Sequence, residues 1–188
     1  MKRSEQNNII ESFSIIVDTR EQATHRSEQR YKSMRAEITR AVLDYGDYTY
    51  NVTLPDGPLH DTSVRIKPKC VIERKQNLDE LAMCFTRSRD RFQREFERAA
   101  AAGARIYLLT ENASYDMILS GQYRSKFQPN AFMASILSWS IRYNMVPVFC
   151  DMKSSGRLIH DILFRDMKDG KNFLLLRRLL HCQHIRQY

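Results

Sequence analysis

The sequence predicts an α/β fold in which a mixed β-sheet is flanked by helices. Short apolar runs recur at residues 12–17, 70–72, 106–110 and 146–150, and runs of this length rich in β-branched residues are typical of strands. Between them, residues 78–99 repeat their apolar side chains at the helical spacing of about 3.6 residues. The early strands are expected to be antiparallel and a β-α-β-α order follows them, so the sheet should be mixed.

The first half of the chain is predicted to be mostly strands. Residues 12–17 (SFSIIV) form the first strand, with Asp18 at its end, and residues 22–35 form a helix or a loop. Residues 37–43 and 47–54 read as a strand and its return strand around Gly46, and PDGP at 55–58 is a turn. Residues 63–73 make the next strand.

The second half alternates helices and strands. Residues 78–99 should form one long helix that Gly103 closes, followed by a strand at 106–110. One or two helical turns are expected at 114–120, a helix capped by Asn130 at 130–143, and a strand at 146–150. The pattern is helical again from 156 to about 181, with an interruption near Gly170.

Composition predicts a single domain over residues 1–188, with a core at about 12–151 and a helical segment at about 156–182. No run approaches the ~18 apolar residues of a membrane span, and MKRSEQNN lacks the apolar run of a secretory signal. Cys70, Cys84, Cys150 and Cys182 show no CxxC spacing, which indicates reduced thiols. We therefore expect a soluble, cytoplasmic protein.

The chain is basic. It carries 30 Lys and Arg against 22 Asp and Glu, a formal net charge of +8. Such a surplus suits a phosphate backbone, because each neutralised phosphate releases counterions. It also occurs in proteins that never touch nucleic acid, so the charge alone leaves DNA binding open.

Three short motifs place carboxylates at or near strand ends, where neighbouring strands can bring them together. They are Asp18-Thr19-Arg20-Glu21, Gly46-Asp47-Tyr48 and Glu73-Arg74-Lys75, with Asp79 beyond the last. Carboxylate oxygens are the ligands that Mg²⁺ prefers, usually one or two per site with water and substrate phosphate. A metal held there can polarise a phosphoryl oxygen and generate hydroxide at neutral pH.

The spacing of the third motif has a geometric consequence. Side chains alternate along a strand, so Glu73 and Lys75 should lie on one side of the sheet and Arg74 on the other. Taken singly, an aspartate at a strand end is usually a turn or cap residue, and ERK is usually a solvated charge run. The ordered combination of the three motifs favours a metal-dependent phosphodiester site.

The ordered set V-D-T-R-E, G-D-Y and E-R-K-x-x-x-D resembles the signature of the XPF-type (ERCC4) nuclease domain family, in a short bacterial or phage-like form. The resemblance spans about residues 15–151. It implies a restriction-endonuclease-like core and a metal-dependent DNA endonuclease that uses Mg²⁺ or Mn²⁺ and is associated with the nucleoid. It implies metal ligation by Asp47, Glu73 and the backbone carbonyl of Arg74, with Asp18 as a further candidate.

The resemblance also implies the other site residues. The catalytic set is Asp18, Arg20, Glu21, Asp47, Glu73, Arg74, Lys75 and Asp79. The DNA contacts are Arg20, Arg74, Lys75 and Arg91. Asp79 could equally be the carboxylate that favours a helix N-terminus.

Larger family members carry a tandem helix-hairpin-helix module after the nuclease domain. Only about 37 residues follow Asp151 here, and they lack paired hairpin glycines, so a preference for branched DNA is an open question. Family nuclease domains dimerise through late helices. Residues 158–167 and 173–180 could form such a homodimer surface or could cover the sheet, and core packing is the favoured reading.

Two rival functions stay open at this stage. One is a catalytically inactive DNA-binding or scaffold subunit, which the intact acidic set argues against. The other is a nuclease acting on RNA, because backbone contacts carry little sugar preference. The arginines at 87, 91, 94 and 98 share a helix face that could follow DNA or simply be solvated. His181-Cys182-Gln183-His184 lacks the second ligand pair of a zinc finger.

Overall fold

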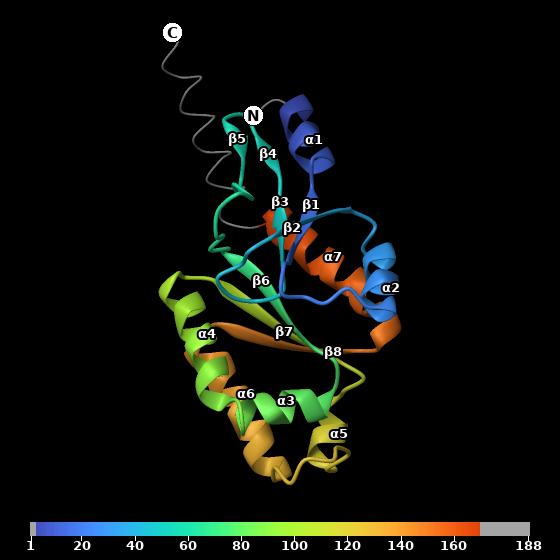
Figure 1. Cartoon of the computed structure of the whole chain (residues 1–188), viewed down its shortest axis with the longest axis vertical. Helices are drawn as coiled ribbons and strands as arrows, with labels where there is room; N and C mark the ends of the chain where they lie inside the picture. The colour runs from blue at the N-terminus through green and yellow to red at the C-terminus, as the bar shows by residue number, and fades with distance from the viewer. Residues whose placement is uncertain (1–2, 170–188) are drawn as a thin grey trace.

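The computed structural model describes residues 3–169 and has a six-stranded mixed sheet at its centre (Figure 1). The strands are β1 (Ser14–Asp18), β2 (Glu37–Ala41), β3 (Tyr48–Asn51), β4 (Thr53–Leu54), β5 (Gly57–Pro58), β6 (Cys70–Lys75), β7 (Arg105–Glu111) and β8 (Met145–Cys150). The helices are α1 (Arg3–Glu11), α2 (His25–Met34), α3 (Leu78–Phe85), α4 (Arg89–Ala101), α5 (Tyr115–Leu119), α6 (Pro129–Arg142) and α7 (Met152–Asp169). The mixed α/β class is confirmed.

The strand order is β2-β1-β3-β6-β7-β8. β1 is parallel to β2 and antiparallel to β3, and β3 is antiparallel to β6. β6, β7 and β8 are parallel to one another. The predicted pairing of residues 37–43 with 47–54 is therefore wrong. The fully buried side chains of Ile15, Ile16 and Val17 put β1 between those two strands, since so apolar a strand is best buried with neighbours on both edges.

The strand predicted at 63–73 begins later, at Cys70. Pro68 precedes it and has no backbone N–H to give to a ladder. Residues 61–69 instead form a loop, in which Ile66 makes an isolated parallel bridge with Leu43 beyond the end of β2. The predicted strand was too long because its polar half had the right alternation but no partner strand.

The long helix predicted at 78–99 is two helices, α3 and α4, with a break at residues 86–88. The Thr86 hydroxyl donates to the carbonyl of Ala82, and such local bonds compete with helix continuation. The break brings the ring of Phe85 to 4.8 Å and that of Phe92 to 5.3 Å from Trp139. Aromatic packing thus decides the geometry that helical spacing alone could not.

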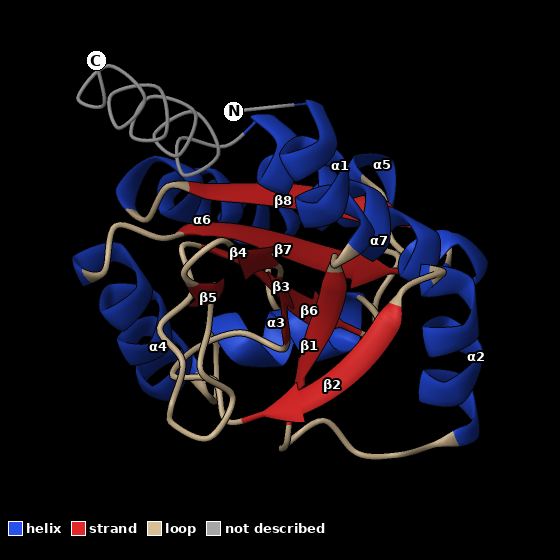
Figure 2. Cartoon of the chain, turned by 90° about the horizontal axis from the view of Figure 1, so that it is seen from above, coloured by secondary structure: helices blue, strands red, loops and turns tan. Residues whose placement is uncertain are grey.

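Helices cover both faces of the twisted sheet (Figure 2). α3, α4 and α6 bury an aromatic cluster around Trp139 against one face. α1 and α7 bury Ile9, Ile159, Leu163 and Met167 against the other, where α2 packs on α7. α6 begins at Pro129 with Gln128 in the capping position, so the predicted cap at Asn130 is displaced.

The burial of α7 bears on the dimer surface expected from the late helices. Its apolar residues within 158–167 contribute to the core, as the favoured reading had it. Residues 173–180 and the motif at 181–184 lie outside the described residues, so the homodimer stays a prediction. No helix within residues 3–169 combines the length and the apolar character needed to cross a membrane.

Candidate active site

The three motifs meet at one edge of the sheet. The backbone N–H of Asp18 donates to the carbonyl of Asp47 at 2.8 Å, and the N–H of Asp47 donates to the carbonyl of Ile72 at 2.8 Å. These bonds hold the end of β1, the start of β3 and the end of β6 side by side. Backbone hydrogen bonds alone therefore hold these three segments together, although they are far apart in the sequence.

Gly46 shapes the approach to Asp47. Its φ is +72°, and a Cβ at this position would lie 2.1 Å from the Cγ2 of Val71, so both the conformation and the space require glycine. Its N–H donates to Glu95 Oε1 on α4 at 2.8 Å. The glycine of the G-D-Y motif thus lets the chain cross close over β6 and present Asp47 beside Glu73.

Asp47 and Glu73 form a pair of acids in which Glu73 is buried and Asp47 is half-buried. The Asp47 Oδ2 accepts from the backbone N–H of Arg74 at 2.8 Å. Burial and, after it, the negative charge of Glu73 together raise the pKa of Asp47 to about 8. Burial also raises the pKa of Glu73. Two acids held together with poor hydration favour a cation between or beside them.

Lys75 lies on the same side of the sheet as Glu73, as strand alternation predicts. Its Nζ is 2.5 Å from Glu73 Oε1 and 5.2 Å from the centroid of the Phe92 ring. Burial alone would lower the pKa of Lys75, but the charges of Glu73 and Asp47 outweigh it and the pKa is raised. Lys75 therefore carries a fixed positive charge inside the site.

Asp18 and Arg20 form a second unit at the rim. One Asp18 oxygen accepts from the N–H and the Nε of Arg20, both at 2.7 Å. The other accepts from the N–H of Leu43 at 2.7 Å and from the Arg20 Nη2 at 3.2 Å. The Arg20 side chain keeps 57% of its surface exposed. Both Asp18 oxygens thus accept hydrogen bonds from Arg20, and one also accepts from Leu43. They orient an Arg20 guanidinium that faces solvent.

Arg74 points to the opposite side of the sheet, into a network that sequence reasoning missed. It pairs with Glu111 at 3.2 Å and with Glu21 at 3.4 Å. Arg30 of α2 pairs with the same two acids at 3.0 Å, and its Nη1 donates to the hydroxyl of Tyr48. Burial opposes ionisation of Arg74, yet the neighbouring negative charges raise its pKa.

The network contains two residues with no motif to reveal them. Glu111 follows an apolar strand, and Arg30 lies on a helix whose outward neighbours are polar. A sequence signal exists only for Glu111, because a carboxylate directly after a buried strand matches the placement of Asp18. Nothing in the local pattern around Arg30 indicates that it is buried.

Glu95 is the third residue that the sequence did not reveal. It shares α4 with the arginines at 91, 94 and 98, where the sequence gives a glutamate no role beyond balancing their charge. In the structure it anchors Gly46, and its charge raises the pKa of Glu73 and of Arg20. The site therefore has a third carboxylate at its border, on the α4 side.

The remaining predicted residues lie further out. Asp79 is in the first turn of α3, where it accepts from the N–H and the Nε of Arg124 at 2.6 and 2.8 Å. The hydrogen bond from Arg124 lowers the pKa of Asp79. Arg91 is exposed on α4, with no hydrogen bond or ion pair from its side chain to any other residue within 3–169.

The donor set fits a hard divalent cation with few protein ligands. Asp47 and Glu73 supply carboxylate oxygens, and Arg74, whose N–H donates to Asp47, follows Glu73 in β6. In the part of the chain that the structure describes, no three His, Cys, Asp or Glu side chains are grouped as a metal cluster. Mg²⁺ usually takes only one or two protein carboxylates, and Asp47 and Glu73 are two.

Comparisons with known proteins agree with this architecture. The family model of the ERCC4 domain matches residues 17–162, whereas a search of curated proteins gave no match. XPF from Aeropyrum pernix superposes with a TM-score of 0.54 at 16% identity, covering 80% of this chain and 59% of that chain. XPF from Aeropyrum pernix in complex with DNA gives 0.55 at 17%, covering 83% and 65%.

The chain thus spans 59% to 65% of the length of these XPF structures. At such low identity the likeness is one of fold, and it supports the restriction-endonuclease-like core that the resemblance implied. The family model covers most of the chain and includes all three motifs. The chain therefore belongs to the ERCC4 domain family.

Proposed function

We propose that the chain is a metal-dependent DNA endonuclease that hydrolyses phosphodiester bonds. The observation that carries the proposal is the pair of the half-buried Asp47 and the buried Glu73, with the ammonium of Lys75 against Glu73. This arrangement is unfavourable without a cation and a phosphate to share its charges. The family membership and the fold shared with a DNA-bound XPF support DNA as the substrate.

Each residue has a role in this proposal. Asp47, Glu73 and the backbone carbonyl of Arg74 would hold Mg²⁺ or Mn²⁺. When bound, such an ion lowers the pKa of water and stabilises negative charge on a phosphoryl oxygen. Lys75 keeps its proton, so it orients the attacking water or neutralises the phosphate rather than acting as a base.

Arg20 would contact the phosphate backbone at the rim, because Asp18 orients it while its side chain stays exposed. The Arg74 side chain is committed to Glu21 and Glu111. Its proposed contribution is therefore the position of its backbone, which donates to Asp47. Glu21 contributes through its ion pairs in the same network and is not a proposed metal ligand.

The test is cleavage by Asp47→Asn, Glu73→Gln and Lys75→Met variants of a panel of duplex, flapped, forked and RNA substrates with Mn²⁺ or Mg²⁺. We expect the first two to lose carboxylate-dependent Mn²⁺ binding and detectable cleavage. Lys75→Met should bind Mn²⁺ but cleave about 10²-fold or more slowly, because it loses the charge that stabilises the phosphate. Glu37→Gln, an exposed carboxylate on β2, is the matched control.

Full cleavage by Asp47→Asn or Glu73→Gln would contradict the proposal. Absence of both cleavage and Mn²⁺ binding in the unsubstituted chain would favour the scaffold function instead. Cleavage of RNA alone would retain the mechanism and change the substrate.

A further inference from the structure

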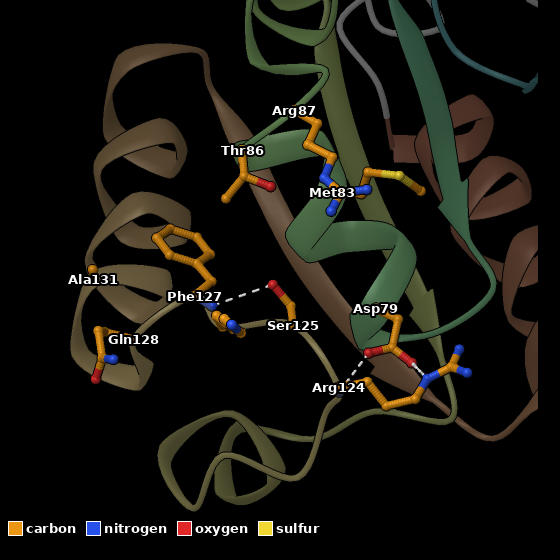
Figure 3. A pocket seen from close by; sticks show the side chains of 10 residues that line it. Asp79, Met83, Thr86, Arg87, Arg124, Ser125, Phe127, Gln128 and Ala131 are labelled. Atoms are coloured by element: carbon orange, nitrogen blue, oxygen red, sulfur yellow. Dashed lines mark hydrogen bonds and ion pairs between the residues drawn. The ribbon is translucent and has the colours of Figure 1, made fainter.

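An open groove of about 910 Å³ lies beside the site, between α3 and the segment that leads into α6 (Figure 3). It begins at Asp79, four residues after Lys75 in sequence. Lys75 packs over Phe92 of α4, so the groove and the catalytic pair share the face of the sheet covered by α3 and α4. A polymer that leaves the catalytic pair along α3 would enter this groove at Asp79, in the first turn of that helix.

The rim of the groove is positively charged. Arg87, Arg124 and Lys126 line it, and Asp79 is the one acid in its lining. Arg124 satisfies that acid through its Nε and backbone N–H, and its side chain is 88% exposed. Within residues 3–169, Arg87 and Lys126 take part in no ion pair, so their charges remain available to a ligand.

Apolar side chains also line the groove, and the wall opposite α3 is held in place. Met83 of α3 is 46% exposed, and Phe127 and Ala131 line the groove from the opposite segment (Figure 3). The Phe127 ring stacks on Phe132 at 5.1 Å, and the Tyr123 hydroxyl donates to the carbonyl of Phe127. These contacts anchor the segment that carries Arg124 and Lys126, so both cations project from a packed support.

We propose that this groove binds an unpaired DNA strand that continues from the catalytic site. Cations along the rim match the phosphates, while an exposed thioether and an aromatic ring in the lining suit unstacked bases. This combination is how single strands are bound without sequence preference. A paired duplex would present its bases inward and leave the apolar lining unused. The inference rests on the proposed function, because it takes DNA as the substrate, but it does not depend on the cleavage reaction.

The experiment uses the double substitution Arg87→Glu and Lys126→Glu in an Asp47→Asn background, so that the DNA stays uncut. The matched control is Lys32→Glu with Lys67→Glu in the same background. Both control lysines are exposed, and Lys67 precedes the end of β6 that lies away from the catalytic edge. The two proteins have the same net charge, and circular dichroism and thermal unfolding check that both fold.

Binding is measured by fluorescence anisotropy with a duplex that carries a single-stranded arm and with a blunt duplex, over a series of salt concentrations. We expect the groove variant to lose at least tenfold in affinity for the armed DNA and clearly less for the blunt duplex. The slope of the logarithm of its affinity against the logarithm of the salt concentration should become shallower by about 1.4. This is about 0.7 for each lost phosphate contact on a single strand. The control should lose little and equally on both DNAs.

Equal losses in the groove variant and the control, or unchanged binding in the groove variant, would overturn the groove proposal. So would an equal loss on both DNAs, which would indicate a duplex contact. Absence of binding in the background protein would also overturn it. The endonuclease proposal is judged separately by cleavage with the unsubstituted chain, so the two can fail independently.

Discussion

The raised pKa of Asp47 favours its protonated form in the metal-free chain, whereas binding a metal ion requires the ionised carboxylate. In the folded chain its pKa is about 8 because of burial and the charge of Glu73, against an ordinary value of 3.8. The folded chain therefore binds more protons than the unfolded chain between these pH values. The stability that this proton provides is fully present below pH ~4 and is lost as the pH rises through about 8.

This predicts the behaviour of Asp47→Asn in metal-free solution. Asparagine can still accept from the Arg74 N–H but carries no charge. The variant should be more stable than the unsubstituted chain at pH 8, by about 1 kcal/mol or more, and the gain should shrink toward zero at pH 4. Urea unfolding at several pH values in the presence of EDTA measures it.

Asp79→Asn is the control, since the pKa of Asp79 is lowered by its hydrogen bond with Arg124. Its folded-state pKa lies below the unfolded one, so its stabilising contribution is present above the unfolded pKa and is lost as the pH falls. Asp79→Asn should therefore give no gain at pH 8. A gain for Asp47→Asn that does not depend on pH would contradict the raised pKa of Asp47 that burial and the charge of Glu73 produce.

At the same scale, the sequence predicts some site residues better than others for a physical reason. Glu73 and Lys75 are two apart on one strand, so their common side follows from backbone geometry alone. The tight turn at Gly46 beside Asp47 is also a local property. Glu95 and Arg30 reach their partners only through the packing of α4 and α2, and no local pattern encodes that packing.

Among the elements, strands with an uninterrupted apolar run were predictable from the sequence. The pairing of the strands and the break between two helices were not. β7 and β8 begin within one residue of their predicted starts and end within one residue of their predicted ends. The partner of β2 is β1 rather than β3, because pairing depends on which strand is most deeply buried. The break between α3 and α4 depends on Trp139, which lies about fifty residues further along the chain.

The contact between α2 and α7 leads to a prediction at this scale. A Cβ on Gly156 of α7 would lie 2.1 Å from the Ser33 Oγ and 2.3 Å from the Arg30 carbonyl oxygen. Gly156→Ala should force the helices apart and destabilise the fold by about 1–3 kcal/mol, although alanine favours an isolated helix. Urea unfolding measures the loss.

The double substitution Ser33→Ala with Gly156→Ala separates the two clashes. It removes the hydroxyl contact but not the backbone contact, so it should restore only part of the lost stability. A stabilising Gly156→Ala would mean that helix propensity outweighs the close approach of the two helices.

The two halves of the sheet are joined by a short strand pairing, which we call the seam, and the candidate site lies across it. The sheet joins β2, β1 and β3 to β6, β7 and β8 through β3 and β6, whose register contains one residue pair, Tyr48 with Ile72. The neighbouring parallel strands β6 and β7 share six such pairs. Asp47 lies on one side of the seam and Glu73 on the other.

The buried ionic network crosses this seam. Glu21 and Arg30 belong to the part that contains β1, while Arg74 and Glu111 belong to β6 and β7. The network therefore adds charged contacts where backbone pairing is sparse. It also explains why the Arg74 side chain turns away from the catalytic pair, since its partners join the two parts of the sheet.

Glu111→Gln should consequently affect both the fold and the site. It leaves Arg30 and Arg74 without one of their two shared acids in a buried position, and losing one partner of a buried ion pair costs about 3–5 kcal/mol. We expect a loss of about 3 kcal/mol in the free energy of unfolding and weaker Mn²⁺ binding, although Glu111 is not a proposed ligand. The exposed Glu37→Gln should stay within about 0.5 kcal/mol of the unsubstituted chain.

Hydrogen exchange locates the effect. If the network fastens the seam, amides of β3 and β6 should exchange faster in Glu111→Gln while those of β8 keep their protection relative to the global stability. Uniform loss of protection across the sheet would show that Glu111 supports the core generally. In that case the geometry of Asp47 and Glu73 would depend on the backbone bonds around the motifs and not on the ionic network.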